Sequence, residues 1–362
     1  MKVLQILPEL NSGGVERGTL ELAGYLVARG HQSVVVSNGG SMVKSLQENG
    51  SSHIRMPVHS KSPKALLQVR ALRRVLRMER PTILHVRSRL PAWISYLAWK
   101  KMPPEQRPVL ISTVHGFNSV NSYSRIMTMA ERVIAVSDCI KKHVIRHYPS
   151  CPPARIHVIP RGVDPDCYHP AHKPDTHWKS KWKEEFPELQ GRKLVTLPGR
   201  ITRLKGHEDF FAVMAQLPAE FHGVVAGGAH SRKRGYMEEL MRHLTRTNLR
   251  ERITFIGQRN DMREVLSESS MVVSLSQSPE SFGRTTLEAL SLGTPVIGYD
   301  HGGVGEILRS CFPEGRVPKG EVNKVVQMIP RIMEQTPSIE APGNFTLSRM
   351  LSSTMSLYLD AI

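Results

Sequence analysis

Two glutamates, Glu280 and Glu288, stand with seven residues between them in the segment Ser278–Leu290, which reads SPESFGRTTLEAL. The Phe-Gly pair between them is expected to lead into a helix that begins near Gly283. Unpaired N–H groups at a helix start attract anions such as phosphate. Glu288 would lie about one turn into this helix, within reach of a ribose diol, and Glu280 would face sugar hydroxyls. Either glutamate alone is more simply a surface charge, but the whole pattern after a buried strand predicts a binding site.

Two cations form a second candidate group. Arg200 and Lys205 lie in the segment Leu197–Gly206 (LPGRITRLKG), between a predicted strand and a predicted helix. In open α/β sheets, ligands bind at the carboxyl ends of the strands. Two cations there can neutralise a diphosphate, which needs that neutralisation when it leaves a sugar. The alternative is a solvated basic loop, and the spacing alone does not separate the two.

A glycine turn follows the first predicted strand, in the segment Asn11–Gly18 (NSGGVERG). Gly13 and Gly14 would expose backbone N–H groups at a helix start, which suits a phosphate. The dinucleotide pattern G-x-G-x-x-G is not matched, and the second predicted strand ends at Asn38 without the acidic residue that would hold a ribose. An NAD-type site is therefore disfavoured, and a tight turn without a ligand is the alternative.

His115 directly follows the apolar run VLISTV and precedes a Gly-Phe pair. A histidine at the carboxyl end of a strand can bond to a sugar hydroxyl or donate to an oxygen. An isolated histidine is more often structural, so this residue alone leaves both interpretations open.

Short apolar runs alternate with amphipathic segments along the chain, six in the first half and five in the second. Such runs are typical of parallel strands buried on both faces, so each half is predicted to form a doubly wound α/β sheet. The chain is also long enough for two cores. We expect domains at 1–165 and 166–345, with a proline-rich linker over 160–190. Residues 347–358 form one more amphipathic helix, whose partner cannot be identified from the sequence.

The charge of the chain is one-sided. The 362 residues carry a net charge of +17. Residues 1–165 hold 24 Lys and Arg against 9 Asp and Glu, whereas residues 166–362 hold 25 against 23. Such a field attracts a polyanion, which can be nucleic acid, an anionic membrane or a phosphorylated substrate.

Cysteines and apolar runs indicate the compartment. The four cysteines, at positions 139, 151, 167 and 311, have no C-x-x-C spacing, so neither a zinc site nor a redox pair is indicated. No apolar run approaches the ~20 residues that cross a bilayer, and the first residues lack the pattern of a signal peptide. A reducing cytosol is the expected location.

Six segments together resemble glycosyltransferase family 4, whose members are retaining enzymes with the GT-B fold. They are GGVERGTLELA, STVHG, AVS before a helix, VIPRGVD, PGRITRLKG, and ESFGRTTLEALSLGTPVI. The resemblance runs from Met1 to near Leu308, and the block with the two glutamates is its most specific part. The segment Val86–Trp93 (VRSRLPAW) further resembles members that build lipopolysaccharide cores.

The resemblance implies two Rossmann-like domains that face each other across a cleft, with the last helix, 346–362, crossing back onto the first domain. It also implies roles for individual residues. His115 would touch the sugar ring near the reacting carbon, and Arg200 and Lys205 would clamp the diphosphate. Glu280 would hold sugar hydroxyls and Glu288 the ribose. The other implied donor contacts are Gly13, Gly14, Gln258, Phe282, Gly283, Arg284 and Thr285.

The implied reaction is transfer of a hexose from a nucleoside-diphosphate sugar with retention of configuration. The acceptor hydroxyl would attack the face that the diphosphate leaves, and the leaving phosphate can take its proton. No DxD-type motif is evident, so neither a metal nor another cofactor is expected. UDP-, GDP- and ADP-sugars all remain open as donors. The implied acceptor is a lipid-linked or lipopolysaccharide-core saccharide.

The basic first half would be the acceptor domain of this fold. Arg87, Arg89 and Trp93 are expected to contact either the acceptor or the headgroups of an anionic membrane. The alternative is that Trp93 packs on the sheet while the cations are merely solvated. We expect a cytoplasmic protein, peripheral on the inner face of the cytoplasmic membrane.

Two other classes of protein fit part of the pattern. A sugar-nucleotide epimerase shares the two-domain architecture but needs no acceptor. A basic nucleic-acid- or membrane-binding protein without catalysis would explain the charge but not the two glutamates. No nucleic-acid motif is present, so no nucleic-acid partner is expected. A hydrolase is disfavoured because G-x-S-x-G is absent.

Overall fold

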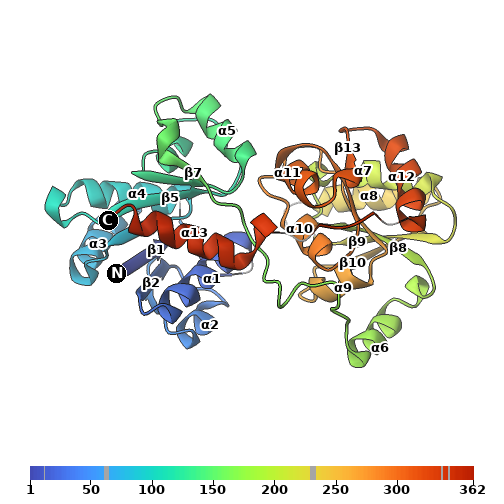
Figure 1. Ribbon diagram of the computed structural model, residues 1–362, viewed down its shortest axis with the longest axis horizontal. Coiled ribbons are helices and arrows are strands. Elements are labelled where there is room, and N and C mark those ends of the chain that lie inside the picture. Colours follow the sequence, from blue (N-terminus) through green and yellow to red (C-terminus); the bar gives the residue numbers. More distant parts are fainter. Residues whose placement is uncertain (12, 61–64, 229–233, 336, 341–342) are drawn as a thin grey trace. The chain divides into compact units, whose positions relative to one another are not determined.

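The computed structural model describes residues 1–11, 13–60, 65–228, 234–335, 337–340 and 343–362. They form two compact units, one made of Met1–Arg161 and Ser348–Ile362 and the other of Gly162–Leu347 (Figure 1). Each unit has its own parallel sheet and its own hydrophobic core. The predicted α/β class, with one doubly wound sheet in each half, is confirmed.

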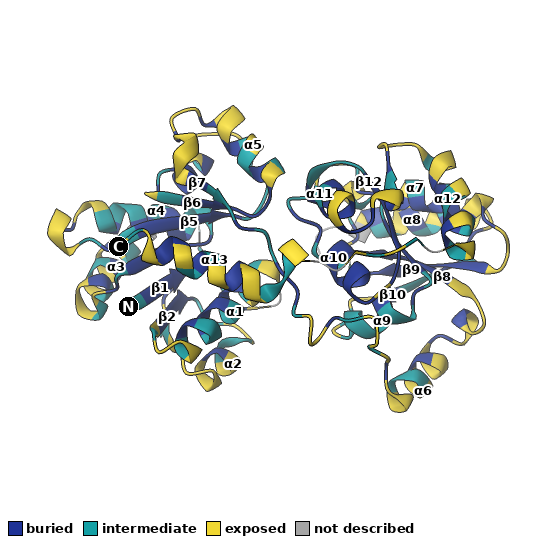
Figure 2. Ribbon diagram, in the orientation of Figure 1, coloured by how far each residue is buried: buried dark blue, intermediate teal, exposed yellow. Residues whose placement is uncertain are grey.

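Within the described residues, the sheet of the first unit has seven parallel strands in the order β3-β2-β1-β4-β5-β6-β7. They are β1 (Lys2–Ile6), β2 (Gln32–Ser37), β3 (Ser52–Arg55), β4 (Ile83–Val86), β5 (Val109–Val114), β6 (Arg132–Ala135) and β7 (Ile156–Val158). Val3 of β1 pairs with Ser33 of β2 on one side and with Ile83 of β4 on the other. The central strands are buried, as Figure 2 shows, because parallel strands covered on both faces carry apolar residues on both.

The described helices of the first unit cover this sheet. They are α1 (Gly14–Ala28), α2 (Val43–Glu48), α3 (Ala65–Glu79), α4 (Arg89–Lys100), α5 (Asp138–His147) and, from the far end of the chain, α13 (Leu347–Leu359). In α3, Leu72 and Leu76 are buried whereas Arg70 and Arg74 are exposed, so an apolar stripe at helical spacing faces the core. The Ser137 hydroxyl caps α5 by accepting a hydrogen bond from the Ile140 N–H at 3.3 Å.

Helix α13 completes the first unit through both apolar and polar contacts. Met350, Leu351 and Tyr358 are buried on it. The Tyr358 hydroxyl lies 2.6 Å from Nδ1 of His85 in β4, and Nε2 of His85 lies 2.7 Å from the Thr113 hydroxyl in β5. Residues 273 positions apart in sequence thus share one buried chain of hydrogen bonds.

The chain crosses between the units twice, and the two crossings emerge from paired backbone in the second unit. The Val163 N–H donates to the Phe345 carbonyl at 3.0 Å, and the Leu347 N–H donates to the Val163 carbonyl at 2.7 Å. A side chain on Gly162 would lie 2.2 Å from the Thr346 carbonyl carbon. Glycine is therefore required where the first crossing enters this pairing.

Within the described residues, the second unit has six parallel strands in the order β10-β9-β8-β11-β12-β13. They are β8 (Lys193–Pro198), β9 (Phe221–Ala226), β10 (Ile253–Gly257), β11 (Met271–Ser274), β12 (Val296–Tyr299) and β13 (Arg316–Val317). Its described helices are α6 (Thr176–Glu185), α7 (His207–Gln216), α8 (Arg234–Arg246), α9 (Met262–Glu268), α10 (Arg284–Ser291), α11 (Gly302–Cys311) and α12 (Val322–Glu334). In the described ranges of either unit, no helix is both long and apolar enough to span a bilayer.

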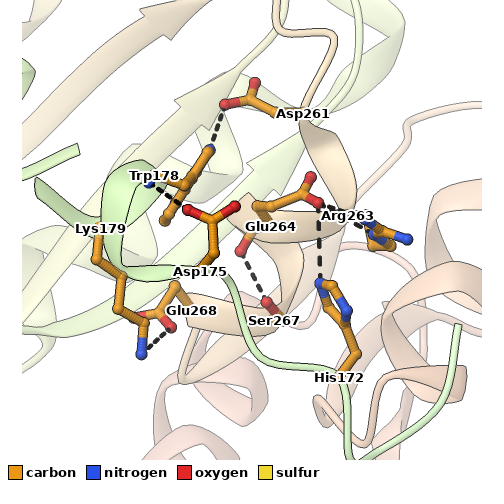
Figure 3. A network of polar contacts seen from close by, with 9 residues as sticks. All are labelled: His172, Asp175, Trp178, Lys179, Asp261, Arg263, Glu264, Ser267 and Glu268. Carbon is orange, nitrogen blue, oxygen red and sulfur yellow. Dashed lines mark hydrogen bonds and ion pairs between the residues drawn. The ribbon is translucent and has the colours of Figure 1, made fainter. Parts of the chain in front are cut away.

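The predicted linker contains helix α6, which side chains hold onto α9 (Figure 3). Asp175 caps α6 by accepting from the Trp178 N–H at 2.7 Å, and the Trp178 indole donates to Asp261 at 2.7 Å. Lys179 and Glu268 form an ion pair at 3.4 Å. Asp261 and Glu268 are far from α6 in the sequence. The local composition of 160–190 therefore predicted a linker, whereas the folded protein has a helix there.

The Tyr358→Phe variant tests the docking of α13. It would remove the hydroxyl and leave the buried Nδ1 of His85 without its partner, which we expect to lower the free energy of unfolding by about 1–3 kcal/mol. Denaturant unfolding of both proteins measures the difference. Tyr96→Phe is the matched control, because no hydrogen bond of the Tyr96 hydroxyl occurs among the described residues. Equal stability of the Tyr358→Phe protein and the wild type would contradict this account of α13.

Candidate functional site

The strand order of the second unit creates a ligand position between β8 and β11. The chain runs from β8 towards β10 on one side and then returns to place β11 on the other side of β8. Loops that leave the carboxyl ends of two such strands diverge, and the crevice between them is where open α/β sheets bind ligands. Lys205 lies in the loop after β8, and Glu280 lies in the loop after β11.

Lys205 and Glu280 form an ion pair at this point. Lys205 Nζ lies 2.8 Å from Glu280 Oε1, and each side chain retains 23% of its exposure. The Ser276 hydroxyl donates to the same oxygen. Burial alone would raise the pKa of the Glu280 carboxyl, but the charge and hydrogen bonds of Lys205 and Ser276 outweigh it and hold the pKa below its usual value. The carboxylate is therefore ionised at neutral pH, and both side chains of the pair are partly exposed.

The backbone around Lys205 fixes the position of this pair. Gly206 adopts a left-handed conformation with φ of 73°, and a side chain there would lie 1.9 Å from the Leu275 carbonyl oxygen. The Gln277 N–H donates to the Leu204 carbonyl at 2.7 Å. The loops after β8 and β11 are thus joined by backbone contact as well as by the ion pair.

Helix α10 begins beside Glu280. Gly283 precedes it with φ of 97°, and a side chain on Gly283 would lie 2.7 Å from Val304 Cγ2. Glu288 is buried within α10 and pairs with Arg284 at 2.9 Å. The remaining predicted residues of this segment also lie at the helix start, where Phe282 is buried and Thr285 is half-buried. The first N–H groups of a helix attract anions, so this helix start is a candidate second anion-binding element.

Residues at the start of α11 belong to the same site and were missed by the sequence analysis. The Gly303 N–H donates to the Glu280 carbonyl at 2.8 Å, and a side chain on Gly302 would lie 2.6 Å from that same oxygen. His301 donates from Nε2 to the Ser276 carbonyl at 2.8 Å. The signal was available, since a Gly-Gly pair between a strand and a helix is the pattern already noted at Gly13 and Gly14.

Arg200 and Gln258 lie on exposed loops of the second unit, after β8 and β10 respectively. Among the residues that the structure describes, Arg200 forms no ion pair. Gly199 lies under Lys205, since a side chain there would come within 2.8 Å of Lys205 Cε. The cation predicted at the strand end is therefore free to turn towards a ligand, while Lys205 is already held.

The first unit has a separate recess of about 210 Å³ at the carboxyl ends of its strands. Its lining includes Glu16, Arg87, Arg89, Thr113, His115 and Asn118. His115 follows β5, and its Nδ1 accepts a hydrogen bond from Arg161 at 2.6 Å. Burial, then the charges of Arg161 and Arg87, hold the pKa of His115 well below 6.5, so its ring is neutral.

Arg87, Arg89 and Trp93 do not form an exposed patch. Arg87 is 5% exposed, and its guanidinium donates to the Gln5 side chain at 2.9 Å. Arg89 donates to the Ser124 hydroxyl at 3.1 Å, and the Trp93 indole donates to the Tyr123 carbonyl at 2.9 Å. Arg87 is therefore too buried for the predicted headgroup contact, and its guanidinium faces internal partners and the recess of the first unit. Trp93 packs against the core of the first unit, which is the alternative given for it above.

Gly13 and Gly14 lie exposed where α1 begins. A side chain on Gly13 would lie 2.2 Å from a carboxylate oxygen of Glu16, so this carboxylate folds over the helix start. A carboxylate is favoured there by the helix dipole. A phosphate at the same N–H groups would have to displace it.

The sequence matches two family models that together span most of the chain. "Glycosyltransferase Family 4" matches residues 12–167, and "Glycosyl transferases group 1" matches residues 179–344. The chain belongs to the glycosyltransferases that these two models describe. Among curated relatives, alpha-maltose-1-phosphate synthase of Mycobacterium tuberculosis is 31% identical to this glycosyltransferase over 186 residues, which are 49% of this chain and 46% of the relative. The match thus spans about half the length of that relative.

Solved structures confirm the GT-B fold of this glycosyltransferase. A glycosyltransferase from Rickettsia africae is 28% identical, with a TM-score of 0.84 over 99% of this chain and 98% of the other. HepE of Anabaena, solved with UDP-glucose, is 20% identical, with a TM-score of 0.80 over all of both chains. WaaG, a glycosyltransferase involved in lipopolysaccharide biosynthesis, is 16% identical, with a TM-score of 0.68 over 99% of this chain and 98% of the other.

The Glu280→Gln variant tests the ionised pair. The pKa of Glu280 is lower in the folded protein than its ordinary value of 4.5. Its charge therefore stabilises the fold at pH values above 4.5, and this stabilisation is lost as the pH falls through the folded-state pKa. We expect the glycosyltransferase to lose about 1–3 kcal/mol of stability on substitution at neutral pH and much less in acid. Unfolding at pH 7 and at a pH well below 4.5 measures the difference in stability between wild type and variant.

The exposed Glu314→Gln substitution is the matched control for this experiment, and its gap should be small at both pH values. If the difference in free energy of unfolding between wild type and Glu280→Gln stays constant or grows in acid, the carboxylate is not stabilised by its cationic partner.

Proposed function

We propose that this glycosyltransferase moves a hexose from a nucleoside-diphosphate sugar to a saccharide acceptor with retention of configuration. The observation that carries the proposal is the ion pair of Lys205 and Glu280 beside the start of α10, at the position where the strand order of the second sheet reverses. A cation and a helix start suit the diphosphate of a sugar nucleotide, and a carboxylate beside them suits the hydroxyls of its sugar.

The donor diphosphate would bind between Lys205, Arg200 and the N–H groups at the start of α10. Glu280 would accept hydrogen bonds from sugar hydroxyls, which would replace part of its contact with Lys205 and free that ammonium for phosphate. The buried Glu288 would hold the ribose. Because the two side chains already hold each other in place before the donor binds, less reorganisation is needed during the reaction.

Bond breaking would build positive charge on the sugar and negative charge on the diphosphate. Lys205, Arg200 and the helix start would stabilise the leaving group without a metal ion. The acceptor hydroxyl would attack from the face that the diphosphate leaves, and a phosphate oxygen would take its proton. His115 would contact the sugar ring, as the resemblance implies.

The acceptor that we propose is a lipid-linked or lipopolysaccharide-core saccharide. The segment Val86–Trp93 supports this assignment, because it contributes Arg87 and Arg89 to the recess of the first unit. Both arginines can donate to hydroxyl or phosphate oxygens of a phosphorylated saccharide.

A location on the anionic inner face of the cytoplasmic membrane is part of the proposal, and the exposed face of α3 supports it. Arg70, Arg74 and Arg77 are exposed there. Leu67 and Met78 of the same helix are 63% and 65% exposed. Basic and apolar side chains on one helix surface suit a headgroup layer.

Lys205→Ala tests the donor site. We expect turnover with the preferred sugar nucleotide to fall by more than about tenfold, because one group that stabilises the leaving charge is lost. A thermal-shift panel of UDP-, GDP- and ADP-sugars first identifies the donor, since a bound ligand raises apparent stability. Lys183→Ala, at an exposed position of α6, is the control. Unchanged turnover in Lys205→Ala removes this lysine from the mechanism, and product that forms without any acceptor indicates an epimerase.

Sedimentation with liposomes tests the membrane contact. We expect more protein to pellet with anionic than with neutral vesicles at low salt, and a variant without the three exposed arginines of α3 to lose this difference. The variant replaces Arg70, Arg74 and Arg77 with alanine, and the control replaces three exposed lysines of the second unit, Lys181, Lys183 and Lys319. Equal recovery of the wild type with both vesicles contradicts membrane docking.

A further inference from the structure

The Arg161 guanidinium is close to His115 on one side and packs against helix α1 on the other. Arg161 Nη2 lies 2.6 Å from His115 Nδ1, although the two residues follow different strands, β7 and β5. On its other side the guanidinium lies against α1 at Gly18, where a side chain would come within 2.2 Å of Nη1. A residue larger than glycine at this position of α1 would push the guanidinium away from the histidine.

This contact decides which nitrogen of His115 carries the proton. A guanidinium only donates hydrogen bonds and stays charged, so Nδ1 must accept with its lone pair. A neutral imidazole has one N–H, which is therefore on Nε2. The ring is held neutral because burial, and then the charges of Arg161 and Arg87, lower the pKa of His115 well below 6.5.

The Nε2 atom of His115 is buried and has no hydrogen-bond partner among the described protein atoms. Buried N–H groups nearly always have one. His115 lines the recess of the first unit together with Thr113 and Asn118. Because His115 lines this recess, its unpaired N–H is the donor that its ring can offer to a ligand there.

We propose that Arg161 is a positioning residue that fixes His115 as a neutral Nε2–H donor to an oxygen atom of the ligand in this recess. Nε2 then has no lone pair to accept a proton, so His115 binds and orients and does not act as a base. A neutral donor also adds no positive charge beside a sugar carbon on which positive charge develops. Naming the ligand as a sugar rests on the proposed function; the tautomer does not.

Nitrogen-15 NMR of the histidine side chains in the full chain tests the proposal without any substrate. We expect the His115 ring to show a protonated Nε2 and an unprotonated Nδ1, with the signals assigned by their loss in His115→Gln. Arg161→Met should convert this single form into a mixture with the Nδ1–H or the doubly protonated ring, and Arg161→Lys should restore it. A wild-type ring with its proton on Nδ1, or a folded Arg161→Met protein with an unchanged His115 ring, would overturn the proposal.

Gly18→Ala provides a second variant that keeps the arginine. Alanine favours a helix interior more than glycine does, but its methyl group would displace the guanidinium, so the tautomer should change as in Arg161→Met. Arg146→Met, at an exposed position of α5, removes the same charge and should leave the tautomer unchanged. If Arg146→Met changes the His115 tautomer as much as Arg161→Met does, the effect is due to net charge alone and the role of Arg161 is overturned.

Kinetics then connect the tautomer to the reaction. We expect Arg161→Met to lower kcat/KM by about tenfold or more, on the scale of one lost oriented donor, and Arg161→Lys to recover most of it. If no sugar nucleotide binds the wild type but the NMR result holds, the proposed function fails and the inference about Arg161 stands. If transfer occurs and the tautomer is not the one expected, the inference alone fails.

Discussion

One ion pair organises the second unit. Lys205 and Glu280 come from strands that are neighbours in the sheet but far apart in the chain, and they meet only because the strand order reverses between β8 and β11. Gly206 and Gly302 lie beside the pair, and a side chain at either position would clash with the backbone of a neighbouring loop. A site for a charged ligand thus follows from topology first and from side chains second.

The first unit handles charge differently. It buries Arg87 and surrounds two histidines with cations, and burial together with those cations keeps His85 and His115 neutral. Neutral imidazoles between fixed arginines behave as oriented hydrogen-bond groups, not as titrating ones. The excess of positive charge in this half therefore has two parts, an exposed one on α3 and an internal one that holds polar groups in place.

The sequence predicted the sheets well because strands buried on both faces leave continuous apolar runs. It missed β3, an edge strand with exposed Ser52 and Arg55, and the two-residue β13, since neither leaves such a run. Helix α6 was missed because its stability depends on distant partners such as Asp261. The glutamate block placed Glu280 at the correct strand end, but its pairing with Lys205 depends on strand order, which local patterns do not contain. The burial of Arg87 also depends on the tertiary structure, so the sequence alone predicted an exposed basic segment where this arginine is buried.

Helix α13 has a consequence for how the protein is made. A ribosome releases the residues of the first sheet long before it reaches Tyr358, and the whole second unit is translated in between. Until then His85 lacks the hydroxyl that satisfies its ring, and the apolar surface later covered by Met350 and Leu351 stays open to solvent. The nascent first unit is therefore an incomplete domain until α13 has been translated, and its apolar surface is open to aggregation during that time.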